Sequence, residues 1–300
     1  MKDRKYILHM ASPAENISPF DVNMAYDAGF DVVVGYSNID VSNVRPLVQD
    51  AIFSRSVKDA SKTGLFIGGK DLIGALDMLD VAKAAMVPPF EISVFPDPAG
   101  SFTTGAAMVA CAERTLHKQF KAKMADMNVV IYGGKGIVGG VCGILCAQAG
   151  ARVTLVGYDG VDNVAKKAQE YKKRFGCDTI PADGSSDEKN TALLKDADVV
   201  FCAARAGTQV LSLQQMKTAS VKVIADANAV PPAGIEGAGL SDDDTKTEYG
   251  AYSIGPLTSG DVKVKTQYAM FQRMCQSTEP LYLDFQHAAD IARSLVSGKK

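Results

Sequence analysis

Short apolar runs alternate with segments of helical apolar spacing along the first part of the chain. The runs at residues 6–10, 31–35, 65–68 and 91–95 predict buried strands. Residues 44–53 and 71–86 have helical spacing, and Ser18-Pro19 offers an N-cap followed by proline at the first helical position. Strands that alternate with helices are typical of a parallel sheet with helices on both faces.

The later part of the chain repeats this alternation. A long helix is predicted over about residues 103–120, and strands are predicted at 128–132, 152–156, 177–180, 198–202 and 222–225. The polar run at 241–248 predicts a surface loop, and the tail from about 265 to 296 predicts helix with a break at Glu279-Pro280. We therefore expect two α/β domains with a cleft between them. The first is an N-terminal parallel αβα unit, residues 1–105, completed by the helical tail 266–300. The second is a Rossmann domain, residues 106–265.

A glycine-rich turn joins the strand at 128–132 to the helix that follows it. The turn contains Gly134, Gly136 and Gly139 in the spacing G-x-G-x-x-G, and a second strand follows the helix. In such a unit the first glycine permits a tight turn, the second admits a pyrophosphate, and the third allows helix and strand to pack closely. The helix N-terminus, which begins near Ile137 and Val138, would present its N–H groups to the phosphates. The pattern predicts a dinucleotide site, although a plain strand-helix turn would also be rich in glycine.

The end of the second strand predicts which dinucleotide binds. Tyr158-Asp159 follows that strand, and Asp159 lies about twenty residues after the last glycine. A carboxylate there accepts a hydrogen bond from the ribose 2′-hydroxyl and repels a 2′-phosphate, so NAD is favoured while NADP remains possible. Ala203 and Ala204 end the fourth strand, and Asn228 follows the fifth, where it either orients the nicotinamide or caps a loop.

Two further polar segments are candidates for substrate binding. Asp97 and a group of hydroxyl side chains follow the fourth strand of the first domain, where a polar substrate would lie; these hydroxyls are Ser101, Thr103 and Thr104. The same hydroxyls could instead cap the next helix. Lys263 and Lys265 alternate with valines, which predicts an extended stretch with both lysines on one side, either in a site or on a solvated edge strand.

Composition excludes several classes of function. The 300 residues are 47% hydrophobic and 22% charged, with a net charge of −2 and no basic stripe, so we expect no nucleic-acid partner. No apolar run is long enough to span a membrane. The chain has three histidines and six cysteines, and Cys142 and Cys146 share a helix face where core packing is favoured over metal binding. We therefore expect a cytoplasmic protein without a metal site.

The chain resembles the NAD(P)-dependent methylene-tetrahydromethanopterin dehydrogenases of methylotrophic bacteria. The resemblance extends over nearly the whole chain, and the segments most specific to the family are Asn228-Ala-Val-Pro-Pro232 and Lys263-Val-Lys265. The NADP-specific member of the family has an arginine at the end of the second strand, where this chain has Asp159. The resemblance therefore points to the branch that accepts NAD.

The resemblance implies a reaction in one-carbon metabolism, within formaldehyde oxidation. A hydride leaves the methylene carbon that bridges two nitrogens of the reduced pterin and passes to the nicotinamide. No proton moves, which agrees with the scarcity of histidine. Alignment of donor and acceptor can contribute roughly 7–11 kcal/mol to such a reaction. The resemblance places Lys263 at the reaction centre, and Phe20 and Asp21 against the pterin. We also expect a homo-oligomer.

Two alternative functions are compatible with the same two-domain fold. A methylene-tetrahydrofolate or shikimate-type dehydrogenase is possible, although the Tyr-x-x-x-Lys arrangement of the tetrahydrofolate enzymes is not found in the first domain. A non-catalytic dinucleotide sensor would also keep the glycine turn and Asp159. Only the dehydrogenase requires Lys263 and Asp21 to face the nicotinamide.

Overall fold

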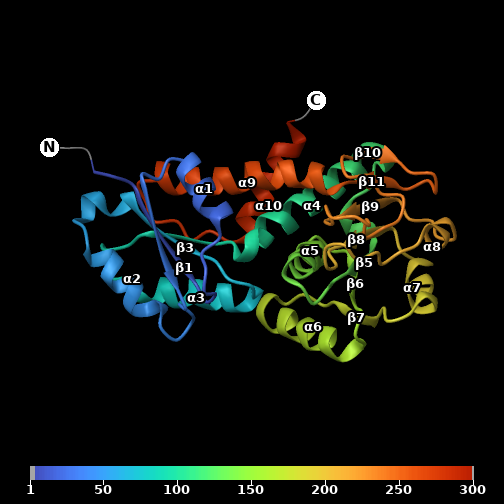
Figure 1. Ribbon diagram of the computed structural model, residues 1–300, viewed down its shortest axis with the longest axis horizontal. Helices are drawn as coiled ribbons and strands as arrows, with labels where there is room; N and C mark the ends of the chain where they lie inside the picture. The colour runs from blue at the N-terminus through green and yellow to red at the C-terminus, as the bar shows by residue number, and fades with distance from the viewer. Residues whose placement is uncertain (1–3, 299–300) are drawn as a thin grey trace. The chain divides into compact units, whose positions relative to one another are not determined.

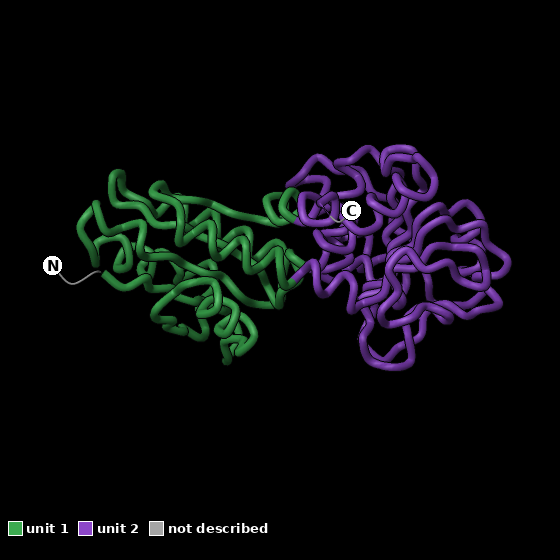
Figure 2. The backbone as a smooth tube through the Cα atoms, turned by 90° about the horizontal axis from the view of Figure 1, so that it is seen from above, with its two compact units in different colours: residues 1–103, 264–291 green, residues 104–263, 292–300 purple. Residues whose placement is uncertain are grey.

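Two units, each with its own parallel sheet, make up the chain (Figure 2). The computed structural model describes residues 4–298. Unit 1 comprises residues 1–103 and 264–291, and unit 2 comprises residues 104–263 and 292–300. The two ends of the first predicted domain, residues 1–3 and 299–300, lie outside the described residues.

Unit 1 contains a four-stranded sheet in which all neighbouring strands are parallel. The strands are β1 (Ile7–Ser12), β2 (Val32–Ser37), β3 (Thr63–Ile67) and β4 (Ser93–Pro96), in the order β2-β1-β3-β4. The helices between them are α1 (Pro19–Asp27), α2 (Val44–Phe53) and α3 (Leu72–Ala85), with 3₁₀ turns at Val57–Lys62 and Pro98–Gly100. Figure 1 shows α1 and α9 (Pro256–Gln276) on one side of β1 and β3, and α2 and α3 on the other. The alternating strands and helices thus form three layers, with the sheet between two layers of helices.

Helix α9 (Pro256–Gln276) covers one face of this sheet through an aromatic cluster. The ring of Phe271 lies 5.4 Å from that of Phe66 and 5.3 Å from that of Phe95, between ring centroids. All three side chains are buried, and Phe30 adds an edge contact to Phe271 at 6.2 Å. Tilted and edge-on aromatic pairs of this kind stabilise a core beyond their buried area.

Unit 2 contains a seven-stranded sheet in the order β10-β11-β9-β8-β5-β6-β7. Its strands are β5 (Asn128–Tyr132), β6 (Arg152–Gly157), β7 (Ile180–Asp183), β8 (Val199–Cys202), β9 (Val223–Asp226), β10 (Asp243–Lys246) and β11 (Tyr252–Ile254). All pair in parallel except β10, which is antiparallel to β11. The first five strands have the doubly wound order 3-2-1-4-5, so the winding direction reverses between β5 and β8.

The remaining helices complete the framework. They are α4 (Ser101–Thr115), continued as a π-helix at Leu116–Phe120, a 3₁₀ turn at Met124–Asp126, α5 (Ile137–Gln148), α6 (Val161–Phe175), α7 (Asp187–Leu194), α8 (Leu213–Lys217) and α10 (Phe285–Ser297). The predicted tail 266–300 is divided, because residues from Ala292 onward group with unit 2. There Arg293 forms a bidentate ion pair with Glu113 of α4, at 2.8 and 2.9 Å. The predicted α/β class with parallel sheets is confirmed.

Three local predictions were wrong. The segment with Lys263 and Lys265 is not extended but lies within α9, so the two lysines do not share a side. The predicted strand at 177–180 instead begins at Ile180, because Gly176 ends α6 in the left-handed region and the chain needs a short connection before β7. The predicted loop at 241–248 contains β10, a polar strand at the sheet edge, where polar residues are tolerated.

Candidate functional site

A pocket of about 410 Å³ lies at the carboxyl ends of three neighbouring strands of unit 2. Tyr132 and Gly133 end β5, Gly157 and Tyr158 end β6, and Ala203 follows β8; all of them line the pocket. The pocket therefore lies where the winding of the sheet reverses, the position at which doubly wound sheets bind their ligands.

Glycines shape the turn beneath this pocket. Gly133, not Gly134, has the positive φ, +77°, and a Cβ there would lie 2.3 Å from the carbonyl oxygen of Ala203. A Cβ on Gly139 would lie 2.4 Å from the carbonyl oxygen of Gly133. No side chain fits at either contact, so Gly133 permits the turn and Gly139 lets α5 pack against it. The role predicted for Gly134 as the turn residue belongs to Gly133.

Helix α5 begins directly after this turn. Gly136 is its N-cap, with no side chain to occupy the first N–H groups, which have no partner within the helix. Of the predicted cofactor residues, four line the pocket, namely Gly136, Tyr158, Ala203 and Ala204. The others are not among its lining residues, namely Gly134, Ile137, Val138, Gly139, Asp159 and Asn228.

Asp159 has a partner that sequence reasoning missed. The ammonium of Lys135, in the glycine turn, lies 2.5 Å from a carboxylate oxygen of Asp159 and 4.4 Å from the centre of the Tyr158 ring. Asn163 of α6 donates a second hydrogen bond to Asp159 at 3.0 Å. The hydrogen bond from Lys135 lowers the pKa of Asp159 and raises the pKa of Lys135. Lys135 and Tyr158 line the pocket, whereas Asp159 is not among its lining residues.

Asp226 and Asn228 organise the loop after β9. The side-chain oxygen of Asn228 accepts from the N–H groups of Gly207 and Val230, at 3.1 and 3.0 Å, and its amide donates to Pro232 at 2.7 Å. Asp226 accepts from the N–H groups of Asn228 and Ile235, at 2.9 and 3.0 Å. Burial raises the pKa of Asp226. These contacts are those of the loop-capping alternative, and a contact of Asn228 with nicotinamide stays a prediction.

A row of buried polar side chains follows one face of α9. Lys263 is 9% exposed, and Gln267, one turn further along the same face, is fully buried. The amide of Gln267 donates to a carboxylate oxygen of Asp21 at 2.7 Å, and Asp21 is 3% exposed. Polar groups buried in this way need hydrogen-bond partners and are therefore held in fixed positions. Lys265, by contrast, is exposed.

Asp97 caps the start of α4. Its carboxylate accepts from the N–H groups of Phe102 and Thr103, at 2.8 and 3.3 Å, and from the hydroxyl of Thr103 at 2.7 Å. Asp97 therefore caps α4, whereas the sequence suggested the hydroxyls of Ser101, Thr103 and Thr104 as caps. Ser101 and Thr103 are buried and Thr104 is half-buried, whereas Phe20 of α1 is 45% exposed.

Neither a metal-binding cluster nor a membrane-spanning helix occurs among the described residues. Residues 4–298 contain no group of three His, Cys, Asp or Glu side chains that could hold a metal ion. Cys142 and Cys146 are fully buried in α5, as predicted for core packing, and this burial raises the pKa of both thiols. None of the helices in this part of the chain is both long and apolar enough to cross a bilayer.

Sequence comparisons place the chain among known proteins. The family model described as methylene-tetrahydromethanopterin dehydrogenase, N-terminal, matches residues 19–99. The NAD(P)-dependent methylenetetrahydromethanopterin dehydrogenase of Methylorubrum extorquens is 46% identical over 288 residues, which are 95% of this chain and 97% of the relative. The bifunctional protein MdtA of the same organism is 32% identical over 88% of this chain and 90% of its own length.

Structural comparisons agree at the level of the fold. Shikimate 5-dehydrogenase from Listeria monocytogenes is similar over 97% of this chain and 96% of its own, with a TM-score of 0.55 and 12% identity. NAD-dependent malic enzyme from Thermotoga maritima is similar over 98% of this chain and 84% of its own, with a TM-score of 0.56 and 16% identity. At such low identity these likenesses concern the fold alone.

Proposed function

The chain belongs to the family of methylene-tetrahydromethanopterin dehydrogenases, and from this membership we propose that it oxidises methylene-tetrahydromethanopterin to methenyl-tetrahydromethanopterin with NAD or NADP. The observation that carries the proposal is the 46% identity over 95% of the chain. The pocket at the switch point of a doubly wound sheet supports it independently, because that is where such sheets bind dinucleotides.

The reaction moves one hydride and no proton. The carbon–hydrogen bond of the methylene breaks, its electron pair leaves with the hydrogen for the nicotinamide, and the methenyl cation keeps the remaining hydrogen. The bound dinucleotide supplies the hydride acceptor. The side chains therefore have to bind, align and exclude water, and alignment alone can contribute roughly 7–11 kcal/mol.

We assign the dinucleotide to unit 2. Gly136 and the start of α5 would receive the pyrophosphate, since the first N–H groups of that helix carry its positive dipole. Tyr158 would lie near the adenine ribose at the end of β6, and Ala203 and Ala204 would leave space along the end of β8. Asn228 would act by holding the loop after β9 in place.

We assign the pterin to unit 1. Asp21, held by Gln267, would accept N–H groups of the pterin ring, and the exposed ring of Phe20 would pack on it. Asp97 and Thr103 would act as positioning residues that fix the start of α4, with Ser101 and Thr104 beside them as polar contacts.

Lys263 is the residue that we propose to touch the reacting centre. Its ammonium cannot stabilise a developing methenyl cation, because like charges repel. We therefore propose that it orients the pterin through hydrogen bonds or tunes the field along the hydride path. Lys263 is buried on α9, one turn from Gln267. Burial holds its side chain in the fixed position that orientation of the pterin needs.

The proposed assembly and location are a cytoplasmic homo-oligomer. The six cysteines are free thiols, which suits a reducing compartment. Light scattering coupled to size-exclusion chromatography measures the subunit number directly.

The experiment that tests the function follows the absorbance of the reduced nicotinamide with pure protein, methylene-tetrahydromethanopterin and either cofactor. Methylene-tetrahydrofolate in a parallel reaction tests the alternative substrate. Absence of turnover with every pair, in protein that binds nucleotide, would instead favour the dinucleotide sensor.

A further inference from the structure

Lys135 lies in the glycine turn, beside the place where a dinucleotide would put its adenine ribose. The glycine motif itself gives this position no function. Lys135 stands between Gly134 and Gly136 and lines the pocket together with Tyr158. Its ammonium bridges the Asp159 carboxylate and the face of the Tyr158 ring. The adenine ribose of a dinucleotide lies at the end of the second strand of such a unit, which is where these three side chains meet.

The ion pair between Lys135 and Asp159 is partly exposed to solvent. The two side chains are 30% and 29% exposed, so solvent screens their attraction and the pair adds little stability. Asp159 alone would repel a 2′-phosphate, but the adjacent ammonium cancels its charge. A phosphate dianion is also a stronger partner for an ammonium than a screened carboxylate is.

We propose that Lys135 is the specificity residue for the ribose 2′ position. While it is paired with Asp159, the carboxylate is left to accept a 2′-hydroxyl. When its ammonium turns into the pocket, it binds a 2′-phosphate. This inference rests on the proposed function only in that a dinucleotide occupies the pocket, and it explains how one chain can accept both NAD and NADP.

The test compares ADP with adenosine 2′,5′-bisphosphate by calorimetry. Lys135→Gln should weaken binding of the bisphosphate by about tenfold or more, the scale of one charge-assisted hydrogen bond, and change ADP binding by less than about threefold. Asp159→Asn should strengthen bisphosphate binding, because it frees the ammonium. Lys173→Gln, an exposed lysine near the end of α6, is the matched control and should change neither.

The outcomes separate this inference from the proposed function. Equal losses for both nucleotides in Lys135→Gln, or no loss for either, would overturn the role of Lys135. Wild-type protein that binds both nucleotides but does not oxidise the pterin would remove the proposed function and leave the nucleotide comparison intact.

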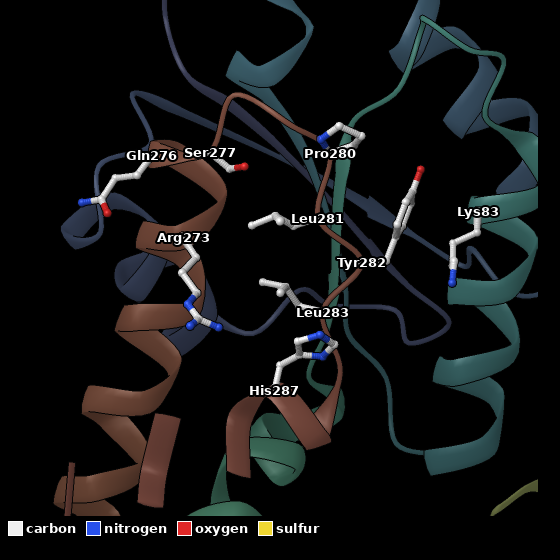
Figure 3. Close-up of a pocket in the computed structure, with 9 residues that line it drawn as sticks. All are labelled: Lys83, Arg273, Gln276, Ser277, Pro280, Leu281, Tyr282, Leu283 and His287. Carbon is white, nitrogen blue, oxygen red and sulfur yellow. The ribbon is translucent and has the colours of Figure 1, made fainter. Parts of the chain in front are cut away.

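A second, independent observation concerns a cavity of about 570 Å³ in unit 1 (Figure 3). It lies among the last turns of α3 and α9, the segment 277–284 and the first turn of α10. Its charged lining side chains are all basic, namely Lys83, Arg273 and His287, and its floor is apolar. Arg273 is ten residues after Lys263 on α9, about 15 Å along the helix, so the cavity is separate from the proposed reacting centre.

Two of these basic side chains lie on one side of the cavity. In Figure 3, Leu281 and Leu283 point to the side where Arg273 and His287 lie, whereas Tyr282 points toward Lys83. A hydrogen bond between His287 and Asp284, 2.7 Å long, raises the pKa of His287. Arg273 forms no ion pair among the described residues. A guanidinium and an imidazole beside an apolar floor suit a small organic oxyanion.

We propose that this cavity binds a small oxyanion, a phosphate or a carboxylate, through Arg273 and His287. The chain has three histidines, so the NMR signals of their rings can be assigned with His287→Gln. Titration with inorganic phosphate, and separately with citrate, should shift the His287 signal saturably and leave those of His9 and His117 in place. The two titrations distinguish phosphate from carboxylate ligands.

Arg273→Gln is the deciding variant. It should weaken the binding seen at His287 by about tenfold or more, the scale of one charge-assisted hydrogen bond. Lys83→Gln should weaken it by less, because that lysine lies beside Tyr282. A linear drift of all three histidine signals with both anions, or an unchanged midpoint in Arg273→Gln, would overturn the proposal.

Discussion

Replacement of Lys263 by methionine tests its proposed role at the reacting centre with little change in side-chain volume. Lys263 and Lys265 are two positions apart on α9, which places them about 200° apart around the helix. Lys263 is 9% exposed on the buried face and Lys265 is exposed. Lys263 and Lys265 therefore offer a variant at the proposed reacting centre and a control on the same turn of the same helix.

The expected effect follows from the cost of misplacing the reacting atoms. If Lys263 orients the pterin, its loss allows a displacement of about 1 Å, which costs about 10²-fold in kcat, or about 2.7 kcal/mol. Methionine keeps most of the aliphatic stem in the buried row, so the fold should be retained. Lys265→Met should keep kcat within about twofold, because an exposed side chain contributes little to positioning.

Single-turnover kinetics with substrate deuterated at the methylene measure the hydride step itself. In Lys263→Met the rate of hydride transfer should fall, and the observed deuterium isotope effect should reach that of the hydride step itself. The affinity for the nucleotide should stay unchanged. Circular dichroism and thermal unfolding report whether the fold is kept. Near wild-type turnover in folded Lys263→Met, or an equal loss in Lys265→Met, would refute a role of Lys263 at the reaction centre.

Three further changes test the surrounding structure. Gln267→Leu removes the hydrogen bond to buried Asp21, so KM for the pterin should rise, with a stability cost of about 1–3 kcal/mol that denaturant unfolding measures. Asp97→Ala removes the cap of α4 and should cost about 1–2 kcal/mol, measured in the same way; an unchanged unfolding midpoint would contradict the capping role. Gly139→Ala puts a Cβ 2.4 Å from the carbonyl oxygen of Gly133, so calorimetry should show that nucleotide affinity falls; wild-type affinity would mean that the turn can adjust.

Local sequence patterns predicted the two-unit α/β plan because strand and helix periods are strong signals when the apolar positions are regular. They failed at Lys263, where valines alternate with lysines over four residues and imitate a strand. Apolar periodicity could not reveal α9 at this point, because its buried face carries polar residues. These residues are Ser259, Lys263, Thr266 and Gln267. The spacing of Lys263 and Gln267, four apart, is the signal that could have done so.

The candidate site was predicted in part for the same reason. The glycine turn is a local motif, and it located the pocket at the end of β5. The pairs to which we assign roles in binding are distant in sequence: Lys135 and Asp159 are 24 residues apart, and Asp21 and Gln267 are 246 apart. No local pattern encodes such pairs, and they became visible only when the strands and α9 were in place.

The most direct test of the proposed function is hydride transfer to the nicotinamide from methylene-tetrahydromethanopterin carrying deuterium at the methylene carbon. The proposed function predicts reduced nicotinamide that carries deuterium at C4, formed in equal amount to methenyl-tetrahydromethanopterin, with no deuterium released to solvent. Deuterium lost to solvent, or methenyl product formed without reduced nicotinamide, would contradict direct hydride transfer between the two bound molecules.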